Sequence, residues 1–323
     1  MKITCYGPRG SLPSPSRKGF STLEYGGNTS CYYVEAGPFR IVLDNGSGVS
    51  SLGDDLMKNL LLPQLKTEGR MGMHFINLIS HYHWDHIQGL PFHIPFFLPG
   101  NVFHIHGHDP SGYEAGKDKC VEPRTAVERL LSEQQSNPHF PVAHECLPAS
   151  RKYYGHPRQF SQTFWYIYTA GEYVKTDIEP ASQSASVLQI TTIPLNHPDG
   201  CLGYRIEHLG KVAVYCTDNE PTRHTNIQIN KHGKNADWML LDGQYTEQQL
   251  SSSTQAFGHG TPNGCIEQAQ ECKAKHLIIH HHDPKHDDAT VAGMEVDAVA
   301  YSDTLLFPKC VEFAREGTTW EIV

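Results

Sequence analysis

The sequence places four potential metal ligands within six residues. The run Ser80-His-Tyr-His-Trp-Asp-His86 contains His81, His83, Asp85 and His86 in the pattern H-x-H-x-D-H. In an extended chain, residues two positions apart point the same way, so the first two histidines can bind one ion while the aspartate and the last histidine face a second. A solvated histidine cluster is the alternative, because the chain contains 21 histidines. The density of ligands favours a metal-dependent hydrolase.

Further candidate ligands follow segments with the apolar pattern of buried strands. Met73–Ile79 precedes His81, Val187–Ile193 precedes His197, Lys211–Tyr215 precedes Asp218, and His276–Ile279 precedes His280, His281 and His282. In layered α/β folds, ligands bind beyond the carboxyl ends of strands, where loops converge. These four strand ends therefore predict one shared site.

Additional strands and helices are expected around these segments. The patterns predict strands at Lys2–Tyr6, Ser30–Glu35 and Arg40–Leu43, and helices at about 51–62, 123–135 and 264–274. Pro63 is expected to end the first of these helices.

The composition is that of an ordinary globular protein. The chain has 323 residues, of which 38% are hydrophobic and 10% aromatic, and it contains no repeat or convincing linker. We expect a single metallo-hydrolase domain over residues 1–323, with an aromatic and basic insertion at about 148–175. A hairpin that packs its aromatic side chains on the body or on another subunit is favoured for this insertion over a nucleic-acid platform.

Charge, cysteine usage and hydropathy narrow the function classes. The net charge of −9 disfavours stable binding to long nucleic acids unless a local basic patch exists. Nine scattered cysteines without a C-x-x-C pair fit neither a disulfide framework nor a cysteine zinc site. The sequence shows neither a signal peptide nor an apolar run of about 18 residues that could span a bilayer. We therefore expect a soluble, cytoplasmic protein with reduced thiols.

The spaced motifs resemble the metallo-β-lactamase fold superfamily, and the resemblance covers nearly the whole chain. It implies an α/β fold, a four-layer αβ/βα sandwich of two mixed sheets flanked by helices. It also implies that His81, His83 and His197 hold a first metal, that Asp85, His86 and His281 hold a second, and that Asp218 bridges both. His282 is the rival of His281 as the final ligand, and His280 is a weaker one.

Within this superfamily the chain is similar to the phosphodiesterase branch that includes tRNase Z and cyclic-nucleotide phosphodiesterases. The resemblance rests on the loops Gly7–Pro13, Tyr25–Cys31 and Leu43–Gly48, and on His259 in Phe257-Gly-His-Gly-Thr261. His259 occupies the place of a catalytic H-S-T motif, with Gly260 where the motif has serine. The glycines of the opening loops could present N–H groups to an anion or simply satisfy turn geometry.

The resemblance implies phosphodiester hydrolysis by a hydroxide that bridges two divalent ions. Asp85 would position or deprotonate the attacking water, and His259 would protonate the leaving ribose oxygen. Zinc is the first expectation for the ions, and manganese and iron also suit such ligands. Asp44 and Asp242 are candidates to orient ligand histidines, although either could instead cap a turn.

The spacing of the ligands bears on the substrate. The tRNA-processing enzymes of the branch carry a long arm between the third histidine and the bridging aspartate, whereas His197 and Asp218 are only 21 positions apart. A small phosphodiester, with a 3′,5′-cyclic nucleotide first, is therefore favoured over tRNA. A lactone or thioester hydrolase and a non-hydrolysing nucleotide-binding module are further alternatives. The resemblance also implies a homodimer; base preference stays open.

Overall fold

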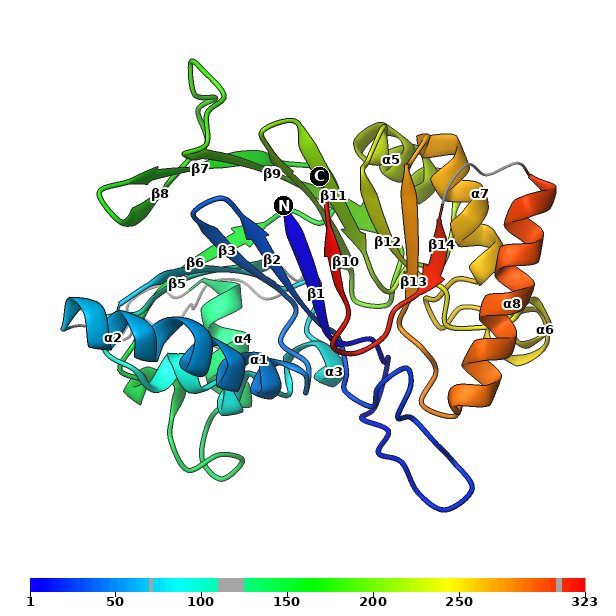
Figure 1. Cartoon of the computed structure of the whole chain (residues 1–323), viewed down its shortest axis with the longest axis horizontal. Coiled ribbons are helices and arrows are strands. Elements are labelled where there is room, and N and C mark those ends of the chain that lie inside the picture. The colour runs from blue at the N-terminus through cyan, green and yellow to red at the C-terminus, as the bar shows by residue number, and fades with distance from the viewer. Residues whose placement is uncertain (70–71, 110–124, 306–309, 323) are drawn as a thin grey trace.

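Two mixed β-sheets form the body of the protein (Figure 1). The computed structural model describes residues 1–69, 72–109, 125–305 and 310–322. The first sheet has the order β15 (Thr319–Glu321), β1 (Lys2–Gly7), β2 (Cys31–Ala36), β3 (Phe39–Leu43), β4 (His74–Leu78), β5 (Val102–His108) and β6 (Ser150–His156). The second has the order β14 (Val311–Phe313), β13 (His276–His280), β12 (Trp238–Asp242), β11 (Lys211–Cys216), β10 (Cys201–His208), β9 (Val187–Leu195), β7 (Thr163–Thr169) and β8 (Glu172–Thr176).

Helices flank both sheets. The helices α1 (Val49–Leu56), α2 (Leu62–Glu68) and α4 (Ala126–Gln134) lie beside the first sheet, and α5 (Arg223–Gly233), α7 (Pro262–Cys272) and α8 (Asp288–Thr304) lie beside the second (Figure 1). The short helices α3 (Trp84–Ile87) and α6 (Glu247–Gln249) belong to connecting segments. The predicted four-layer α/β sandwich is confirmed.

Three apolar clusters correspond to the three interfaces between these layers. One lies between the sheets and includes Ile41 and Leu240; a second lies under α5, α7 and α8, and a third under α1 and α4. A strand that is buried on both faces has a continuous run of apolar residues, and such runs predicted β4, β11 and β13 from the sequence. None of the helices within the described ranges is long and apolar enough to cross a membrane.

The expected end of the first helix at Pro63 was wrong. The helix starts at Val49, passes through a π-helical turn at Met57–Leu61 and continues as α2 to Glu68, before Gly69 in a left-handed conformation. A proline inside a regular α-helix clashes with the carbonyl four residues earlier and cannot donate to it. The π-turn directly before Pro63 removes this regular pairing, so the helix can continue.

The segment at about 148–175 contributes to both sheets. Its first part is β6, which pairs in parallel with β5, and its second part is β7, which pairs with β9 and forms an edge hairpin with β8. Phe164 and Tyr166 of β7 are buried in the cluster between the sheets, whereas Phe160 is exposed. These aromatic residues therefore belong largely to the common core.

Candidate metal centre

The seven predicted ligands converge in two groups that share Asp218. The first group contains His81, His83, His197 and Asp218, and the second contains Asp85, His86, Asp218 and His281. Within each group, one ligand atom from every residue lies within 4.8 Å of the others. The first sheet supplies the residues that follow β4, and the second supplies those that follow β9, β11 and β13. The site therefore lies where strand ends of both sheets meet.

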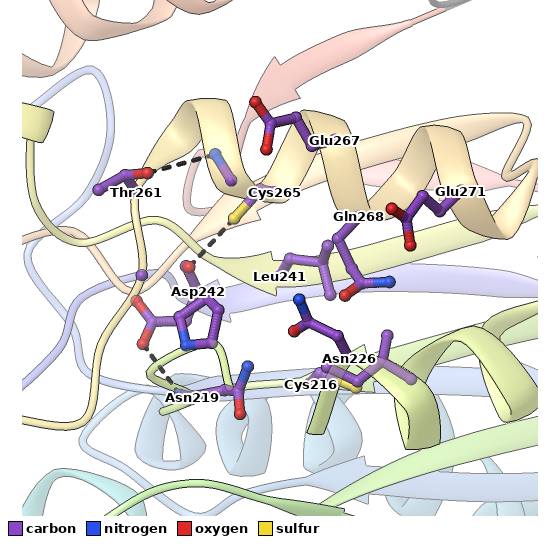
Figure 2. A pocket seen from close by; sticks show the side chains of 14 residues that line it. Cys216, Asn219, Asn226, Leu241, Asp242, Thr261, Cys265, Glu267, Gln268 and Glu271 are labelled. Carbon is purple, nitrogen blue, oxygen red and sulfur yellow. Dashed lines mark hydrogen bonds between the residues drawn. The ribbon is translucent and has the colours of Figure 1, made fainter. Parts of the chain in front are cut away.

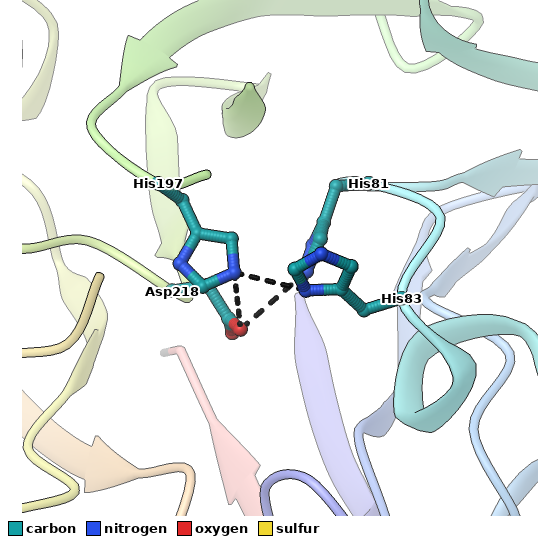
Figure 3. Close-up of side chains that lie close together, drawn as sticks. All are labelled: His81, His83, His197 and Asp218. Atoms are coloured by element: carbon teal, nitrogen blue, oxygen red, sulfur yellow. Dashed lines mark hydrogen bonds and ion pairs between the residues drawn. The ribbon is translucent and has the colours of Figure 1, made fainter. Parts of the chain in front are cut away.

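The side chains of the first group point toward one another from the segments that follow β4, β9 and β11 (Figure 3). His197 Nε2 lies 3.0 Å from His83 Nδ1 and 3.6 Å from an oxygen of Asp218. His81 Nε2 lies 3.5 Å from the same oxygen. Three imidazoles and one carboxylate facing a common point are a ligand set suited to zinc.

The second group is more deeply buried and contains two carboxylates. His86 Nε2 lies 3.1 Å from Asp85 Oδ2 and 3.2 Å from Asp218 Oδ1. His281 lies 3.3 Å from Asp218 through Nδ1 and 3.8 Å from Asp85 through Nε2. One oxygen of Asp85 and one of Asp218 lie within 4.8 Å of each other, and two buried carboxylates so close together favour a cation between them.

The backbone adopts a left-handed conformation at three residues of the site that follow strands. Asp218, shortly after β11, has φ 44°, and His281, directly after β13, has φ 67°. Asp44, directly after β3, has φ 57°. Left-handed conformations cost energy in residues with a Cβ, and they are enriched at functional sites. The fold thus holds these three side chains in place against a local conformational preference.

Several imidazole nitrogens in the centre have no hydrogen-bond partner, although they are buried. This applies to the Nε2 atoms of His81, His86 and His281. The nearby carboxylate oxygens are close, but these contacts lack hydrogen-bond geometry. Leaving a buried polar atom unpaired is costly, whereas a metal ion would satisfy each of these lone pairs. The residues present therefore fit divalent metal ions.

The electrostatics agree with this donor set. Burial lowers the pKa of His81 and of His197, which favours the neutral form that binds metals. Burial alone would raise the pKa values of Asp85 and Asp218, but adjacent histidines hold both below their usual range. Burial would likewise lower the pKa of His86, but three surrounding aspartates raise it well above its ordinary value. The centre thus favours positive charge.

Asp44 holds His86 in position, as considered from the sequence. One of its oxygens lies 2.8 Å from His86 Nδ1 and accepts a hydrogen bond from Tyr215 at 2.6 Å. Ser80 donates to the same carboxylate through its backbone N–H and its hydroxyl, at 2.7 and 2.8 Å. An acceptor on Nδ1 leaves Nε2 available as a ligand atom.

Asp242 contacts His259 instead of a predicted metal ligand. His259 Nδ1 lies 2.8 Å from Asp242 Oδ2, and His259 stacks on His281 with ring centroids 5.0 Å apart. Burial would lower the pKa of His259, but the charge and hydrogen bond of Asp242 raise it to about 9. The Asp242 carboxylate therefore fixes the orientation of the His259 ring beside the two ligand groups.

Two glycines act through their lack of a side chain, and sequence reasoning did not identify this role. A Cβ on Gly10 would lie 2.3 Å from His281 Nε2, and one on Gly258 would lie 2.0 Å from His197 Nδ1. The Gly258 carbonyl also lies 3.0 Å from His197 Nδ1, so this backbone orients the His197 ring. The signal for Gly258 was its position next to His259, whereas nothing local marked Gly10 as a neighbour of His281.

The three consecutive histidines have different surroundings. His281 alone among them lies in the ligand groups formed by the described residues. His282 Nε2 lies 2.9 Å from the carbonyl of Ala314, and His280 packs edge-on against Tyr32. The opening loop reaches the centre as well, because the Ser11 N–H donates to Asp85 Oδ2 at 2.7 Å.

Comparisons with known proteins agree with the fold. The sequence profile of the β-lactamase superfamily domain matches residues 142–282. The metallo-β-lactamase fold protein YhfI from Bacillus subtilis superposes with a TM-score of 0.59 at 20% identity, covering 99% of each chain. No curated protein matches the chain by sequence.

Two further solved structures have names that describe hydrolases. The short form of human tRNase Z superposes with a TM-score of 0.59 at 17% identity, covering all of both chains. A diphosphatase from the PhnP family gives a TM-score of 0.57 at 15% identity, covering 100% of this chain and 98% of the other. These similarities establish the shared architecture.

Proposed function

Because the chain has the metallo-β-lactamase fold and a candidate site rich in histidine and aspartate, we propose that it is a binuclear metal-dependent phosphodiesterase acting on a small phosphodiester. A 3′,5′-cyclic nucleotide is the first candidate substrate. The observation that carries the proposal is the convergence of two ligand groups on Asp218, with the His259–Asp242 pair beside them.

The proposed ligands are those of the two groups. His81, His83 and His197 would hold one ion, Asp85, His86 and His281 the other, and Asp218 both. Zinc is the first choice for both ions, and manganese or iron would also suit imidazole and carboxylate. When bound, two such ions lower the pKa of a water and neutralise phosphate oxygens.

The side chains of the protein supply positioning and proton transfer. Asp85, fixed by the Ser11 N–H, would position or deprotonate the attacking water. His259 would donate its Nε2 proton to the ribose oxygen that leaves, while Asp242 keeps the imidazole oriented through Nδ1. An oriented acid beside the leaving group is worth about 10²–10⁴-fold in rate.

The preference for a small substrate rests on the segment between the ligands His197 and Asp218. This segment contains β10 and β11, an antiparallel pair that runs from Tyr204–Tyr215 to His208–Lys211 in continuous register. It leaves no length for a long substrate-binding arm. The net charge of −9 also opposes a large polyanion.

The test is a substrate panel with metal-loaded protein. We expect hydrolysis of one or more of cAMP, cGMP, cCMP and cUMP, and no cleavage of precursor tRNA. His259→Ala should lower kcat by about 10²-fold or more while metal content stays unchanged. Cleavage of precursor tRNA alone, or of lactones or thioesters alone, would contradict the proposal. Binding of cyclic nucleotides without turnover would favour a nucleotide-binding module instead.

The oligomeric state and location are separate proposals. We propose a homodimer in the cytoplasm, and the edge hairpin β7–β8 offers Tyr168 and Val174 as exposed apolar side chains for contact. Sedimentation of the purified protein tests the dimer; a monomer at micromolar concentration would refute it.

A further inference from the structure

A pocket lies between α5 and α7, and its wall includes Asn219, the residue after Asp218 (Figure 2). Its volume is about 120 Å³. It occupies the outer side of the second sheet, where Leu241 of β12 and Cys216 at the end of β11 form part of its wall. Cavities of about this size bind molecules with roughly half a dozen heavy atoms. The size therefore selects a small ligand.

Hydrogen-bond acceptors are available in this pocket. Asn226 Oδ1 is buried and has no hydrogen-bond partner in the part of the chain that the structure describes. Gln268 uses its amide N–H groups on Asn230 and on Cys272, which leaves its carbonyl oxygen available. In Figure 2, Asn226 and Gln268 approach each other across the pocket from α5 and α7. A ligand with several N–H donors would satisfy both.

The pocket also carries negative charge. Glu271 accepts from Asn230 through Oε2, so its other oxygen remains available. Glu267 also lines the pocket and accepts from Tyr301 through Oε1, whereas the Asp242 carboxylate is occupied by His259 and by the N–H groups of Asn219 and Gln244. The lining residues within the described ranges include no lysine, arginine or histidine. This charge favours a cationic ligand and disfavours an anion such as phosphate.

The rest of the wall is apolar. Ile229 and Leu241 belong to the apolar cluster under α5 and α7, and the Cys216 side chain joins them. Such a wall suits a short hydrocarbon chain, whereas a bare inorganic cation would leave it without a partner.

We propose that this pocket binds a small protonated amine. The ammonium group contacts Asn226, Gln268 and Glu271, and a short alkyl chain covers Ile229 and Leu241. Three N–H donors match the acceptors, and the positive charge balances the Glu271 carboxylate. The site is independent of the proposed hydrolase activity, although Asp242 forms part of both the pocket wall and the His259 pair.

The test compares n-butylammonium with n-butanol, its neutral analogue, on the metal-loaded protein by calorimetry. We expect one amine per chain with a Kd between about 10 µM and about 1 mM, and at least tenfold weaker binding of the alcohol. Methyl signals of Ile229 and Leu241 should shift on titration in the NMR spectrum. Equal binding of both compounds, or no binding of the amine at about 10 mM, would overturn the proposal.

Variants locate the site. Glu271→Gln and Asn226→Leu should each weaken amine binding about tenfold or more, whereas Glu321→Gln, an exposed side chain on β15, should leave it unchanged. His83→Ala alters the metal centre and must retain amine binding; loss there would assign the amine to the histidines instead. The two-ligand comparison on the unaltered chain decides the question even if a pocket variant fails to fold.

Discussion

Two histidine-rich regions of this protein differ in whether their buried ring nitrogens have hydrogen-bond partners. In the metal centre, the buried Nε2 atoms of His81, His86 and His281 have no hydrogen-bond partner. Between the sheets, His106 of β5 and His156 of β6 use both ring nitrogens. The comparison separates histidines that are prepared for a ligand from histidines that complete a core.

The inter-sheet pair, His106 and His156, forms a chain with a single direction. Tyr166 donates to His106 Nε2 at 2.7 Å, His106 Nδ1 donates to His156 Nε2 at 2.8 Å, and His156 Nδ1 donates to Gln162 Oε1 at 2.8 Å. Because an amide oxygen only accepts, both tautomers follow from that end. Unpaired nitrogens that converge on carboxylates therefore distinguish the candidate metal centre better than the number of histidines does.

The strongest test of the comparison removes the residue that both ligand groups share. Asp218→Asn should lower kcat/KM by about 10³-fold or more and reduce the metal content, because the bridging charge is lost. Elemental analysis and steady-state kinetics measure both effects. Asp199→Asn, at an exposed position two residues after His197, serves as the matched control and should behave as the parent protein does. Full metal content in Asp218→Asn would contradict the assignment.

The corresponding change in the inter-sheet pair should affect stability instead. His106→Leu leaves His156 Nε2 and the Tyr166 hydroxyl buried without partners, so we expect a loss of about 2–4 kcal/mol in the free energy of unfolding. Urea denaturation measures this loss, and metal content should not change. His224→Leu, at an exposed position in α5, should shift stability by no more than about 0.5 kcal/mol. Loss of metal in His106→Leu would contradict the assignment of His106 to the core alone.

A smaller effect on metal affinity is expected from Asp44, which contacts His86 but belongs to neither ligand group. Asp44→Asn weakens the hold on His86 Nδ1 while tolerating the left-handed backbone, so metal affinity should fall about 10–100-fold. Competition with a chelator measures this affinity. Asp55→Asn, which alters a surface contact with Tyr6, is the control. Unchanged affinity in Asp44→Asn would show that the loop alone positions His86.

The smallest effect is a pH dependence of stability. Burial lowers the pKa of His106 and of His156, so both are neutral when folded but take up protons when unfolded. Their contribution is therefore complete above about pH 6.5 and declines as the pH falls below it, by up to about 1.4 kcal/mol per pH unit and histidine. Urea denaturation between pH 7 and pH 5 should show a shallower decline for His106→Leu than for the parent. Parallel curves would mean that His106 does not titrate on unfolding.

The convergence of the candidate ligands was predictable because they follow apolar strands at recognisable spacing. His81, His83, Asp85 and His86 are local in sequence, and His197 and Asp218 each follow a strand that is buried on both faces. The choice among three consecutive histidines was harder, since it depends on the left-handed turn at His281 and on the absence of a Cβ at Gly10. Neither the left-handed turn at His281 nor the close approach of Gly10 produces a periodic pattern in the sequence.

Other parts depended on long-range pairing. The segment at about 148–175 reads as an aromatic hairpin, yet the partners of β6 and β7 are β5 and β9, which no local pattern identifies. The helix that passes Pro63 required a π-turn, which propensity rules do not anticipate. The contact between Asp242 and His259 likewise depends on how β12 and the loop that contains His259 pack together, which no local pattern shows.

The origin of the ligands in both sheets has a mechanical consequence. His81 and Asp85 follow β4 of one sheet, whereas His197 and His281 follow strands of the other sheet. Cations bound between these residues would therefore cross-link the two sheets. Removal of the cations by a chelator should then weaken the packing between the two sheets before either sheet unfolds. Faster hydrogen exchange in β4 and β11 would be the first sign of this change.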